Sequence, residues 1–367
     1  MIKKIIALLL LCVYFKTAVA QKEPMKIAVA GLTHTHVHWV LQRASDGDFD
    51  LVGVAEPNKE LAERFFKQYN LPLDILFEDI DSMLENTNPE AICAFNTIRG
   101  HLEVVEKAAP KGIHVMVEKP LAVNLDHARK MEALAKKHQI QLLTNYETTW
   151  YPTNHKIKEI LAEEKETFGQ IRKMVIHDGH PGPQEIGCNI EFLTWLTDPY
   201  YNGAGALTDF GCYGANLSTW LHPNEKPISV TAVTHQFKPH IYPLVDDEAT
   251  IIVTYPNSQS IIQASWNWNY NRKDMEVYTE KGFLKANTRH ELEIMKNEKD
   301  GSKEYMLEER AAPFNDPFSY MMAVIRNEAK MSKSDLSSLE NNMTVMEILQ
   351  AAMISAKEGR TVNLTEL

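Results

Sequence analysis

Short apolar runs alternate with amphipathic segments through the first 145 residues of the chain. The runs are aliphatic or β-branched at nearly every position and cover residues 26–30, 51–55, 91–94, 114–117 and 141–144. Runs of this kind are typical of strands that helices cover on both faces. Segments with helical periodicity lie between them, at residues 59–69, 101–109 and 124–138. The alternation predicts a βαβ series, which is an α/β domain built on a parallel sheet.

The pattern changes after about residue 146, where longer strands with alternating apolar positions replace the buried runs. Residues 250–255 and 260–266 flank the turn Pro256-Asn257, which predicts an antiparallel hairpin. Another turn and strand are expected at residues 281–284, and helices at residues 317–328 and 339–358. We therefore expect an α+β domain with an open, mainly antiparallel sheet over residues 146–367. It follows the α/β domain of residues 21–145, and each domain should have a core of its own.

The first twenty residues have the layout of a cleavable secretory signal. Lys3 and Lys4 precede an apolar run from Ile5 to Phe15, and the small residues Ala18-Val19-Ala20 end the segment. The run is about half of the ~20 residues that a helix needs to span a bilayer, and no later stretch is long and apolar enough. The layout favours cleavage over anchoring. It predicts export to the periplasm without stable membrane insertion.

Charge and cysteine content narrow the classes of partner. The 367 residues include 38 Lys and Arg against 49 Asp and Glu, a formal net charge of −11, and no basic stripe with interleaved aromatics offsets it. A phosphate backbone would be repelled, so nucleic-acid partners are not expected. Cys93, Cys188 and Cys212 remain after the signal and allow at most one disulfide. Their spacing does not resemble a metal knuckle, and buried thiols are the favoured interpretation.

The loop after the first strand reads Gly31-Leu-Thr33-His34-Thr35-His36, at the place where a dinucleotide-binding Rossmann domain has G-x-G-x-x-G. Only the first glycine is present. Gly31 can form the tight turn, whereas the Cβ of Thr33 should push a cofactor outward. The N–H groups of the following helix still suit a pyrophosphate, with the Thr and His side chains as further donors. Taken alone, the loop is weak evidence of a nucleotide site.

Glu56 ends the second strand roughly twenty residues beyond this loop, where a carboxylate can accept both ribose hydroxyls of adenosine. A carboxylate there would repel a 2′-phosphate, so NAD is favoured over NADP, although Lys59 lies nearby in the sequence. The alternative interpretation of Glu56 is an exposed acid at a strand end. The βαβ setting favours ribose binding.

Glu118-Lys119-Pro120 follows a later strand, at the carboxyl edge where open α/β sheets bind ligands. Pro120 restrains the turn, so Lys119 can point into the cleft with little conformational freedom to lose. An isolated tripeptide of this kind would more often be a surface ion pair. A third motif changes that balance.

The third motif surrounds Asp209. If Asp209 begins a helix, then Asp209, Tyr213, Asn216 and Trp220 lie on one face. Oxidation of an alcohol needs a base for the hydroxyl proton and a cation that stabilises the alkoxide-like transition state. Tyr213 beside Lys119 meets both needs, because the ammonium would lower the pKa of the phenol, and Asp209 would orient the lysine or a substrate hydroxyl. The alternative is that Tyr213 packs the helix and Asp209 is its N-cap.

Histidines cluster at residues 34, 36 and 38, and again at His177 and His180. Neutral imidazoles suit transition metals, but helical residues two apart do not face one another, and no carboxylate is an obvious third ligand. No protein-bound metal is therefore expected. Phosphate contact is favoured for His34 or His36, and contact with sugar hydroxyls for His177 or His180. Three of the six tryptophans are either flat walls for a pyranose or core residues. They are Trp195, Trp266 and Trp268.

In this order the three motifs resemble those of the glucose-fructose oxidoreductase, inositol dehydrogenase and rhizopine-catabolism (Gfo/Idh/MocA) family, over essentially the whole mature chain. Asn96 and His101 after the fourth strand and residues 245–249 before the hairpin add to the resemblance. It implies a Rossmann domain joined to an open antiparallel sheet that holds substrate above the nicotinamide, usually in dimers or tetramers. It also implies polyol, aldose or glycoside substrates, oxidised at a ring carbinol. The degenerate glycine loop departs from the family pattern.

The resemblance assigns roles to particular residues. Lys119 would be the catalytic lysine, Asp209 the substrate-orienting acid, and Tyr213 the proton acceptor, at a position where many members have histidine. The expected substrate contacts are Lys119, His177, His180 and Asn216. The expected cofactor site comprises Gly31, Thr33, His34, His36, Glu56, Asn96, His101 and Glu118.

Export and the resemblance together predict a cofactor that stays bound, because free nicotinamide nucleotides are scarce outside the cytoplasm. The main expectation is an exported NAD-dependent oxidoreductase that acts on a carbohydrate, with its cofactor reduced and re-oxidised in place. Two alternatives stay open. One is an enzyme that oxidises a glycoside in order to eliminate its aglycone, and the other is a non-catalytic sugar- or nucleotide-binding protein.

Overall fold

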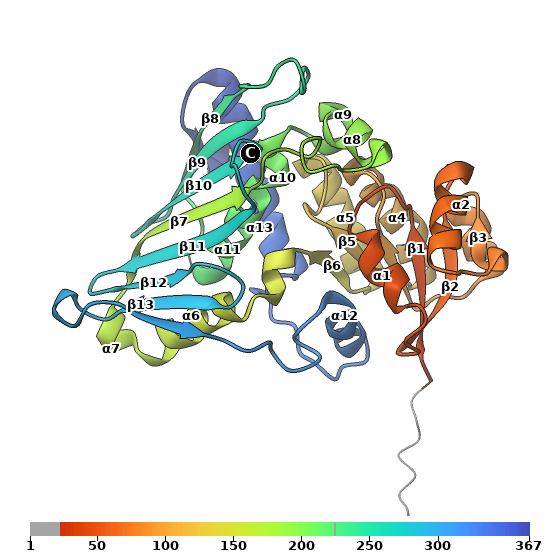
Figure 1. Ribbon diagram of the computed structural model, residues 1–367, viewed down its shortest axis with the longest axis horizontal. Coiled ribbons are helices and arrows are strands. Elements are labelled where there is room, and N and C mark those ends of the chain that lie inside the picture. The colour runs from red at the N-terminus through yellow and green to blue at the C-terminus, as the bar shows by residue number, and fades with distance from the viewer. Residues whose placement is uncertain (1–22, 224) are drawn as a thin grey trace, which may run out of the picture.

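The computed structural model describes residues 23–223 and 225–367. The expected signal, residues 1–20, lies outside the described residues. Figure 1 shows two sheets side by side, a parallel one at the right and a larger open one at the left, with helices between them. Within the described part, every helix is too short or too polar to cross a membrane.

The first sheet has six strands in the order β3-β2-β1-β4-β5-β6, and every pairing is parallel. This confirms the α/β prediction and is the strand order of a dinucleotide-binding Rossmann domain. The strands are β1 (Met25–Ala30), β2 (Phe49–Ala55), β3 (Leu76–Phe77), β4 (Ala91–Ala94), β5 (His114–Glu118) and β6 (Leu142–Asn145). The sequence pattern missed β3, because two residues show no periodicity.

Helices cover both faces of this sheet. They are α1 (Val37–Arg43), α2 (Lys59–Gln68), α3 (Ile80–Asn86), α4 (His101–Ala108) and α5 (Leu125–His138). Local chemistry sets where several of them begin. Asn58 accepts a hydrogen bond from the Leu61 N–H at the start of α2, and Asn124 does the same for α5. These caps satisfy N–H groups that have no partner inside the helix.

The second sheet has nine strands in the order β14-β13-β12-β11-β7-β10-β9-β8-β15. Only the β7–β10 pairing is parallel among those that the structure describes, so the predicted mainly antiparallel sheet is confirmed. The predicted hairpin is β9 followed by β10. The strands are β7 (Ile171–Gly179), β8 (Ser229–His235), β9 (Glu248–Thr254), β10 (Gln259–Ser265), β11 (Arg272–Thr279), β12 (Phe283–Ala286), β13 (Glu291–Met295), β14 (Lys303–Met306) and β15 (Val362–Asn363).

One face of the nine-stranded sheet is covered by helices that also reach the six-stranded domain. The helices after β6 are α6 (Pro152–Glu163), α7 (Lys165–Phe168), α8 (Ile190–Leu196), α9 (Pro199–Asn202), α10 (Ala206–Asp209), α11 (Gly211–Leu221), α12 (Pro317–Ile325) and α13 (Leu339–Glu358). Short 3-10 turns complete the connections, namely η1 (Leu73–Ile75), η2 (Ile98–Gly100), η3 (Ala109–Lys111), η4 (Glu147–Trp150), η5 (Glu298–Asp300) and η6 (Leu364–Glu366).

The expectation of one core per domain is wrong. One apolar cluster runs from one face of the six-stranded sheet to the nine-stranded sheet, because α13 packs against α5 on one side and α11 and β8 on the other. The second cluster fills the other face of the six-stranded sheet, and α12 contributes Phe318 and Met321 to it. The C-terminal part of the chain therefore returns to the first domain and ties the two sheets together.

Candidate active site

Lys119 and Asp209 form a buried ion pair where the two domains meet. Lys119 follows β5 at the carboxyl edge of the parallel sheet, and its Nζ pairs with Asp209 Oδ1 and lies 3.1 Å from the Asp209 carbonyl oxygen. The side chains are 7% and 5% exposed. Burial alone would lower the pKa of Lys119, but Asp209 outweighs it and the pKa is raised. The Lys119 side chain therefore stays protonated and positively charged at neutral pH.

Asp209 does not begin a helix, contrary to the prediction. It is the last residue of α10, and α11 begins at Gly211. The N-cap alternative is also wrong, because the carboxylate of Asp209 instead pairs with Lys119 and accepts the Trp266 Nε1–H at 2.9 Å. Trp266 is fully buried. Of the two interpretations of Trp266, a pyranose wall or a core residue, the structure therefore favours the core residue. Its indole N–H also holds the Asp209 carboxylate in place.

Asp246 fixes the backbone that leads to Asp209. Its two oxygens accept the N–H groups of Gly205 and Leu207 at 2.9 and 2.7 Å. A Cβ on Gly205 would lie 1.8 Å from the Asp246 carbonyl oxygen, so only glycine fits there. The segment before the hairpin and the glycine-rich segment before Asp209 therefore act together, which explains why both belong to one pattern.

Tyr213 is close to Lys119, as predicted, but its protonation is the reverse of the prediction. Lys119 Nζ lies 5.3 Å from the centre of the Tyr213 ring, and Lys273 Nζ lies 5.5 Å from it. Burial first, then the negative charge of Glu147, raises the pKa of Tyr213 well above its ordinary value. The ammonium of Lys119 is engaged by Asp209, so it does not offset the burial. The phenol therefore stays protonated at neutral pH.

A second ion pair, which the sequence reasoning missed, also lies close to Tyr213. Lys273 of β11 pairs with Glu147, and Glu147 also accepts the Tyr151 hydroxyl at 2.7 Å. All three line a cavity of about 560 Å³ whose other walls are polar, including Arg272 and Arg289. The available signal was Glu147, two residues after the strand-ending Asn145 and at the same sheet edge as Lys119.

His180 lies close to Asp209, Lys119 and Lys273, whereas His177 does not. The His180 ring packs 4.9 Å from the Phe210 ring, and its Nδ1 accepts the Gly182 N–H at 3.0 Å. Burial, opposed by Asp209, lowers its pKa to about 4, so a neutral ring presents Nε2–H as a donor. His177 lies on the opposite face of β7, with Nδ1 2.8 Å from Asp274 Oδ2.

Asn216 also lies away from the Lys119–Asp209 pair, although it was expected to contact substrate. It is fully buried, and its Nδ2 donates to the Leu336 carbonyl at 2.8 Å. Because α11 begins after Asp209, the helical phase that would align Asn216 with Asp209 does not exist. Its contact with Leu336, just before α13, makes Asn216 part of the helix–helix core.

The Gly31 loop lies at the switch point between β1 and β4, where such sheets bind ligands. Gly31 has φ +84°, and a Cβ there would lie 2.6 Å from the Cβ of Asn96. The Oδ1 of Asn96 is buried without a partner among the described residues. The Thr33 hydroxyl lies 3.5 Å from the Phe95 carbonyl. A tight turn beside an unsatisfied acceptor fits a bound dinucleotide.

Glu56 is buried at the end of β2, so the interpretation as an exposed acid is wrong. It is 4% exposed, and its oxygens accept the N–H groups of Leu32 and Asn58 at 2.7 and 2.9 Å. Burial raises its pKa although both hydrogen bonds oppose this. Each oxygen keeps a second lone pair for a ribose hydroxyl, and its place agrees with a ribose ligand.

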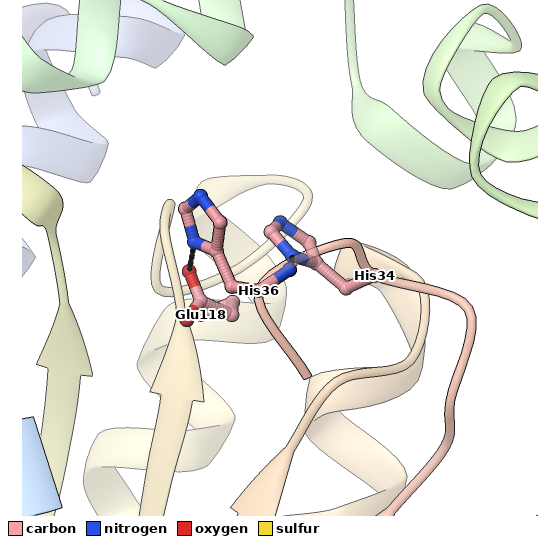
Figure 2. Close-up of side chains that lie close together, drawn as sticks. All are labelled: His34, His36 and Glu118. Carbon is pink, nitrogen blue, oxygen red and sulfur yellow. Dashed lines mark hydrogen bonds and ion pairs between the residues drawn. The ribbon is translucent and has the colours of Figure 1, made fainter. Parts of the chain in front are cut away.

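Figure 2 shows His34 and His36 of the Gly31 loop beside Glu118 at the end of β5. His36 Nδ1 lies 3.0 Å from Glu118 Oε2, and Asn145 donates to the other oxygen at 2.8 Å. Burial would raise the pKa of Glu118, but His36 and His34 with Asn145 hold it down to about 2. Burial lowers the pKa of His34 well below its ordinary value. A neutral His34 can donate to a phosphate but cannot neutralise it.

Two groups have ligand atoms close enough for a metal ion. Those of His34, His36 and Glu118 lie within 4.8 Å of one another, so Glu118 supplies the carboxylate beside the histidines that the sequence did not reveal. The hydrogen bonds among them already account for the arrangement. The second group surrounds His177, but the guanidinium of Arg272 lies 3.2 Å from His177 Nδ1, so a cation already occupies that position.

His101 is buried behind the site, and its Nε2 has no partner among the described residues, so its expected contact with the cofactor stays a prediction. It is completely buried, and its Nδ1 lies 3.1 Å from the Leu121 carbonyl, next to the Lys119-Pro120 turn. Burial lowers its pKa to about 4, so the ring is neutral. This contact fixes the shape of the turn and thus the direction of Lys119.

Helix α8 of the second domain closes over the loop. The rings of Phe192 and Trp195 lie 5.0 and 5.8 Å from the His34 ring, and Glu191 pairs with Arg64 of α2 at 2.8 Å. Trp195 is buried, and its Nε1 has no partner among the described residues. The second domain therefore packs directly against the Gly31 loop of the first.

Two family profiles match the chain, and together they cover most of it. The one described as "Oxidoreductase family, NAD-binding Rossmann fold" matches residues 25–146, and "GFO/IDH/MocA C-terminal domain" matches residues 155–285. Trans-1,2-dihydrobenzene-1,2-diol dehydrogenase of Xenopus laevis is 26% identical over 223 residues, 59% of this chain and 61% of that relative. D-apiose dehydrogenase of Paraburkholderia graminis is 23% identical over 372 residues, 96% of this chain and 92% of that relative. The chain spans about three fifths of the length of the dihydrodiol relative.

Solved structures show the same fold. An aldose-aldose oxidoreductase from Caulobacter crescentus, complexed with glycerol, has a TM-score of 0.75 at 20% identity, covering 93% of this chain and 99% of that one. An inositol dehydrogenase homologue from Azotobacter vinelandii, complexed with NADH and myo-inositol, has a TM-score of 0.77 at 16% identity, covering 93% and 98%. At these identities the likeness establishes the shared architecture.

Proposed function

Because this chain belongs to the Gfo/Idh/MocA oxidoreductase family, we propose that it oxidises a sugar, polyol or glycoside carbinol with a nicotinamide dinucleotide as hydride acceptor. The observation that carries the proposal is the buried pair of Lys119 and Asp209 at the carboxyl edge of the parallel sheet. Desolvated cations near a reacting oxygen stabilise the negative charge that develops on it. Lys119 would do so for the alkoxide-like oxygen, and Asp209 would hold its ammonium in place.

The dinucleotide would lie along the carboxyl edge of the six-stranded sheet. Gly31 would adjoin its pyrophosphate, the open Oδ1 of Asn96 would accept a hydrogen bond from a donor group of the dinucleotide, and Glu56 would accept the adenosine ribose hydroxyls. The nicotinamide would supply the hydride acceptor. The carboxylate of Glu56, whose hydrogen bonds within the described residues come from backbone N–H groups and not from a cation, favours NAD over NADP. The test is the ratio of Kd values for the two dinucleotides, measured by fluorescence with wild type and Glu56→Ala.

Two features support a polyhydroxylated substrate. The cavity of about 560 Å³ beside Tyr213 has polar and charged walls, with Tyr151 and Tyr270 as flat surfaces, and sugars combine hydroxyl groups with apolar faces that suit such walls. The solved neighbours were crystallised with glycerol and with myo-inositol. His180 and Tyr213 would donate hydrogen bonds to hydroxyls of the bound sugar.

We propose further that the protein is exported to the periplasm and keeps its cofactor. The support is the signal-like segment of residues 1–20 and the scarcity of free nicotinamide nucleotides outside the cytoplasm. The experiment purifies the protein from the periplasmic fraction without added nucleotide, determines its N-terminal residue, and assays the denatured sample for dinucleotide. A start at Gln21 with one NAD per active chain is expected. An active protein that holds no nucleotide would refute retention.

A panel of sugars, polyols and glycosides then decides between the functional alternatives. Formation of a ketosugar with reduced nicotinamide supports the oxidoreductase, whereas release of an aglycone supports oxidation followed by elimination. A protein that binds nucleotide and sugar but turns over neither is a binding protein. Lys119→Met should abolish turnover, and Lys137→Met on the exposed end of α5 serves as the control.

We also propose that the protein forms a homo-oligomer, a dimer or a tetramer. Large apolar side chains are exposed on β8 and the segment after it, where Val233, Phe237 and Leu244 are 68%, 59% and 65% exposed. Exposed apolar groups close together commonly mark interaction surfaces. Light scattering on the wild type and on Val233→Lys tests this, because the charge should release monomers.

A further inference from the structure

Asp178 is an acid in an apolar position of β7. The residues that share its face of the strand, Met174 and Ile176, are completely buried against the helices, and Asp178 itself is 1% exposed. Neither of its carboxyl oxygens has a hydrogen-bond partner among the residues that the structure describes. Burial of an unsatisfied polar group is costly, so a native acid in this state calls for an explanation.

The strand register places Asp178 beside the proposed active site. Its cross-strand neighbours are Ala264 of β10 and Lys273 of β11, and neighbours in register share one face of a sheet. A Cβ on Gly211, the first residue of α11, would lie 3.9 Å from the Ala264 Cβ. Lys273 lies 5.5 Å from the ring of Tyr213. The carboxyl group is therefore held between two residues that both contact the first turn of α11.

Charged and titratable groups surround Asp178 from every element packed against it. They are Lys273 and Asp274 of β11, Glu147 of η4, Tyr151 directly after η4, Cys212 of α11, and Lys119 after β5. Burial, with Asp274 and Glu147, raises the pKa of Asp178 well above its ordinary value, against the opposing effect of the two lysines. A carboxylate with a raised pKa is a stronger base than an ordinary one, which suits proton transfer near neutral pH.

The other polar groups of the site are already committed. Lys119 is a cation, and Tyr213 stays a neutral phenol. His180 presents its Nε2–H, because its Nδ1 accepts the Gly182 N–H. Both oxygens of Asp209 accept hydrogen bonds, one from Lys119 and one from Trp266. Asp178 is the acid of this site whose two oxygens accept no hydrogen bond within the described residues.

We propose that Asp178 contacts the substrate and accepts the proton of the reacting hydroxyl. The inference rests on the proposed function and replaces Tyr213 in that role. In the step, the carbinol C–H bond breaks and its hydrogen leaves with both electrons to the nicotinamide, while the hydroxyl proton passes to Asp178. The carbon becomes a ketone, and Lys119 stabilises its oxygen. In the reverse direction Asp178 returns the proton.

The experiment compares wild type, Asp178→Asn and the control Glu304→Gln, whose exposed side chain lies on β14 far along the sheet. Asparagine keeps the size of the side chain but cannot take a proton. We expect Asp178→Asn to bind NAD with the wild-type Kd and to lose about 10²- to 10⁴-fold in kcat. The rise of kcat with pH, which follows ionisation of Asp178 in wild type, should disappear. Glu304→Gln should behave as wild type in every assay.

Two readouts separate this role from a structural one. The infrared carbonyl band of a protonated carboxylic acid should be present in wild type without substrate, vanish as the pH is raised, and be missing in Asp178→Asn. The midpoint of thermal unfolding of Asp178→Asn should equal or exceed that of wild type, because no hydrogen bond is lost. A lowered midpoint together with lowered activity would assign Asp178 a structural role and overturn the inference.

The failure of the inference can be told from the failure of the proposed function. If wild type binds NAD and oxidises a sugar while Asp178→Asn keeps its kcat within a few fold and its pH profile, the inference alone is overturned. If wild type binds no dinucleotide, the proposed function falls and the inference falls with it.

Discussion

Lys119→Met removes the cation from the buried pair and leaves Asp209 charged. The two side chains are 7% and 5% exposed, so little water can solvate the stranded carboxylate. Removal of one partner from a buried ion pair typically costs about 3–5 kcal/mol. Since whole domains are stable by only about 5–15 kcal/mol, we expect Lys119→Met to remain folded but to unfold at a distinctly lower urea concentration.

Asp209→Asn provides the second arm of a double-mutant cycle. The asparagine keeps an oxygen that can accept the Trp266 Nε1–H, so the main loss is again the charge of the pair. In the double variant neither charge is stranded. Its loss of unfolding free energy should therefore be smaller than the sum of the two single losses by about 2–3 kcal/mol. Urea titrations followed by tryptophan fluorescence and by circular dichroism measure all four proteins. Singles within about 0.5 kcal/mol of wild type, or strictly additive effects, would refute the idea of a desolvated pair.

Three further predictions follow from the same contacts. Gly31→Ala should abolish dinucleotide binding in a calorimetric titration, whereas Gly112→Ala, also at positive φ but with open space around it, should cost about 1 kcal/mol and leave binding intact. The pKa of His101 falls from 6.5 to about 4 on folding, so the unfolded chain binds the extra proton and stability is lost as pH falls from 6.5 to 4; His101→Gln should remove up to about 3 kcal/mol of that pH dependence in urea titrations. Trp266→Phe should lower kcat more than it raises KM, because it frees Asp209 without touching substrate; an unchanged kcat would show that this hydrogen bond does not position the acid.

Much of the fold could be predicted from local pattern. The runs that became β1, β2, β4, β5 and β6 are apolar on both faces, which happens when helices cover both sides of a parallel sheet. The hairpin of β9 and β10 and the long helix α13 were likewise visible in periodicity alone. The merging of the two cores could not be predicted, because it depends on how α13 packs against α5, a contact between distant segments.

The site divides in the same way. Lys119, Asp209 and Tyr213 could be identified from motifs, since each lies in a short run with distinctive neighbours. The protonation of Tyr213 could not, because it depends on burial and on Asp209 drawing the ammonium of Lys119 away. Asp178 was missed for another reason. An acid at an apolar phase of a strand was visible in the sequence, but the two neighbouring histidines drew the interpretation to themselves.

The misplaced residues share one cause, which is an error in helical phase or strand phase. Asn216 was expected on the same helix face as Asp209, on the assumption of a single helix. The helix is interrupted before Gly211, and the Asn216 side chain lies in the core. His177 was grouped with His180, although strand alternation sends it to the other face. In a strand, a shift of one residue moves every side chain to the opposite face. In a helix, the same shift turns each side chain by about 100° around the axis.

The most direct test is a crystal structure of the protein grown from material purified without added nucleotide and soaked with NAD. The proposed function requires the dinucleotide along the carboxyl edge of the six-stranded sheet, with its adenosine ribose at Glu56 and its nicotinamide ring beside the Lys119 ammonium and the Tyr213 ring. Density for the dinucleotide elsewhere, or a cleft that α8 keeps closed to it at saturating NAD, would contradict the proposed redox chemistry.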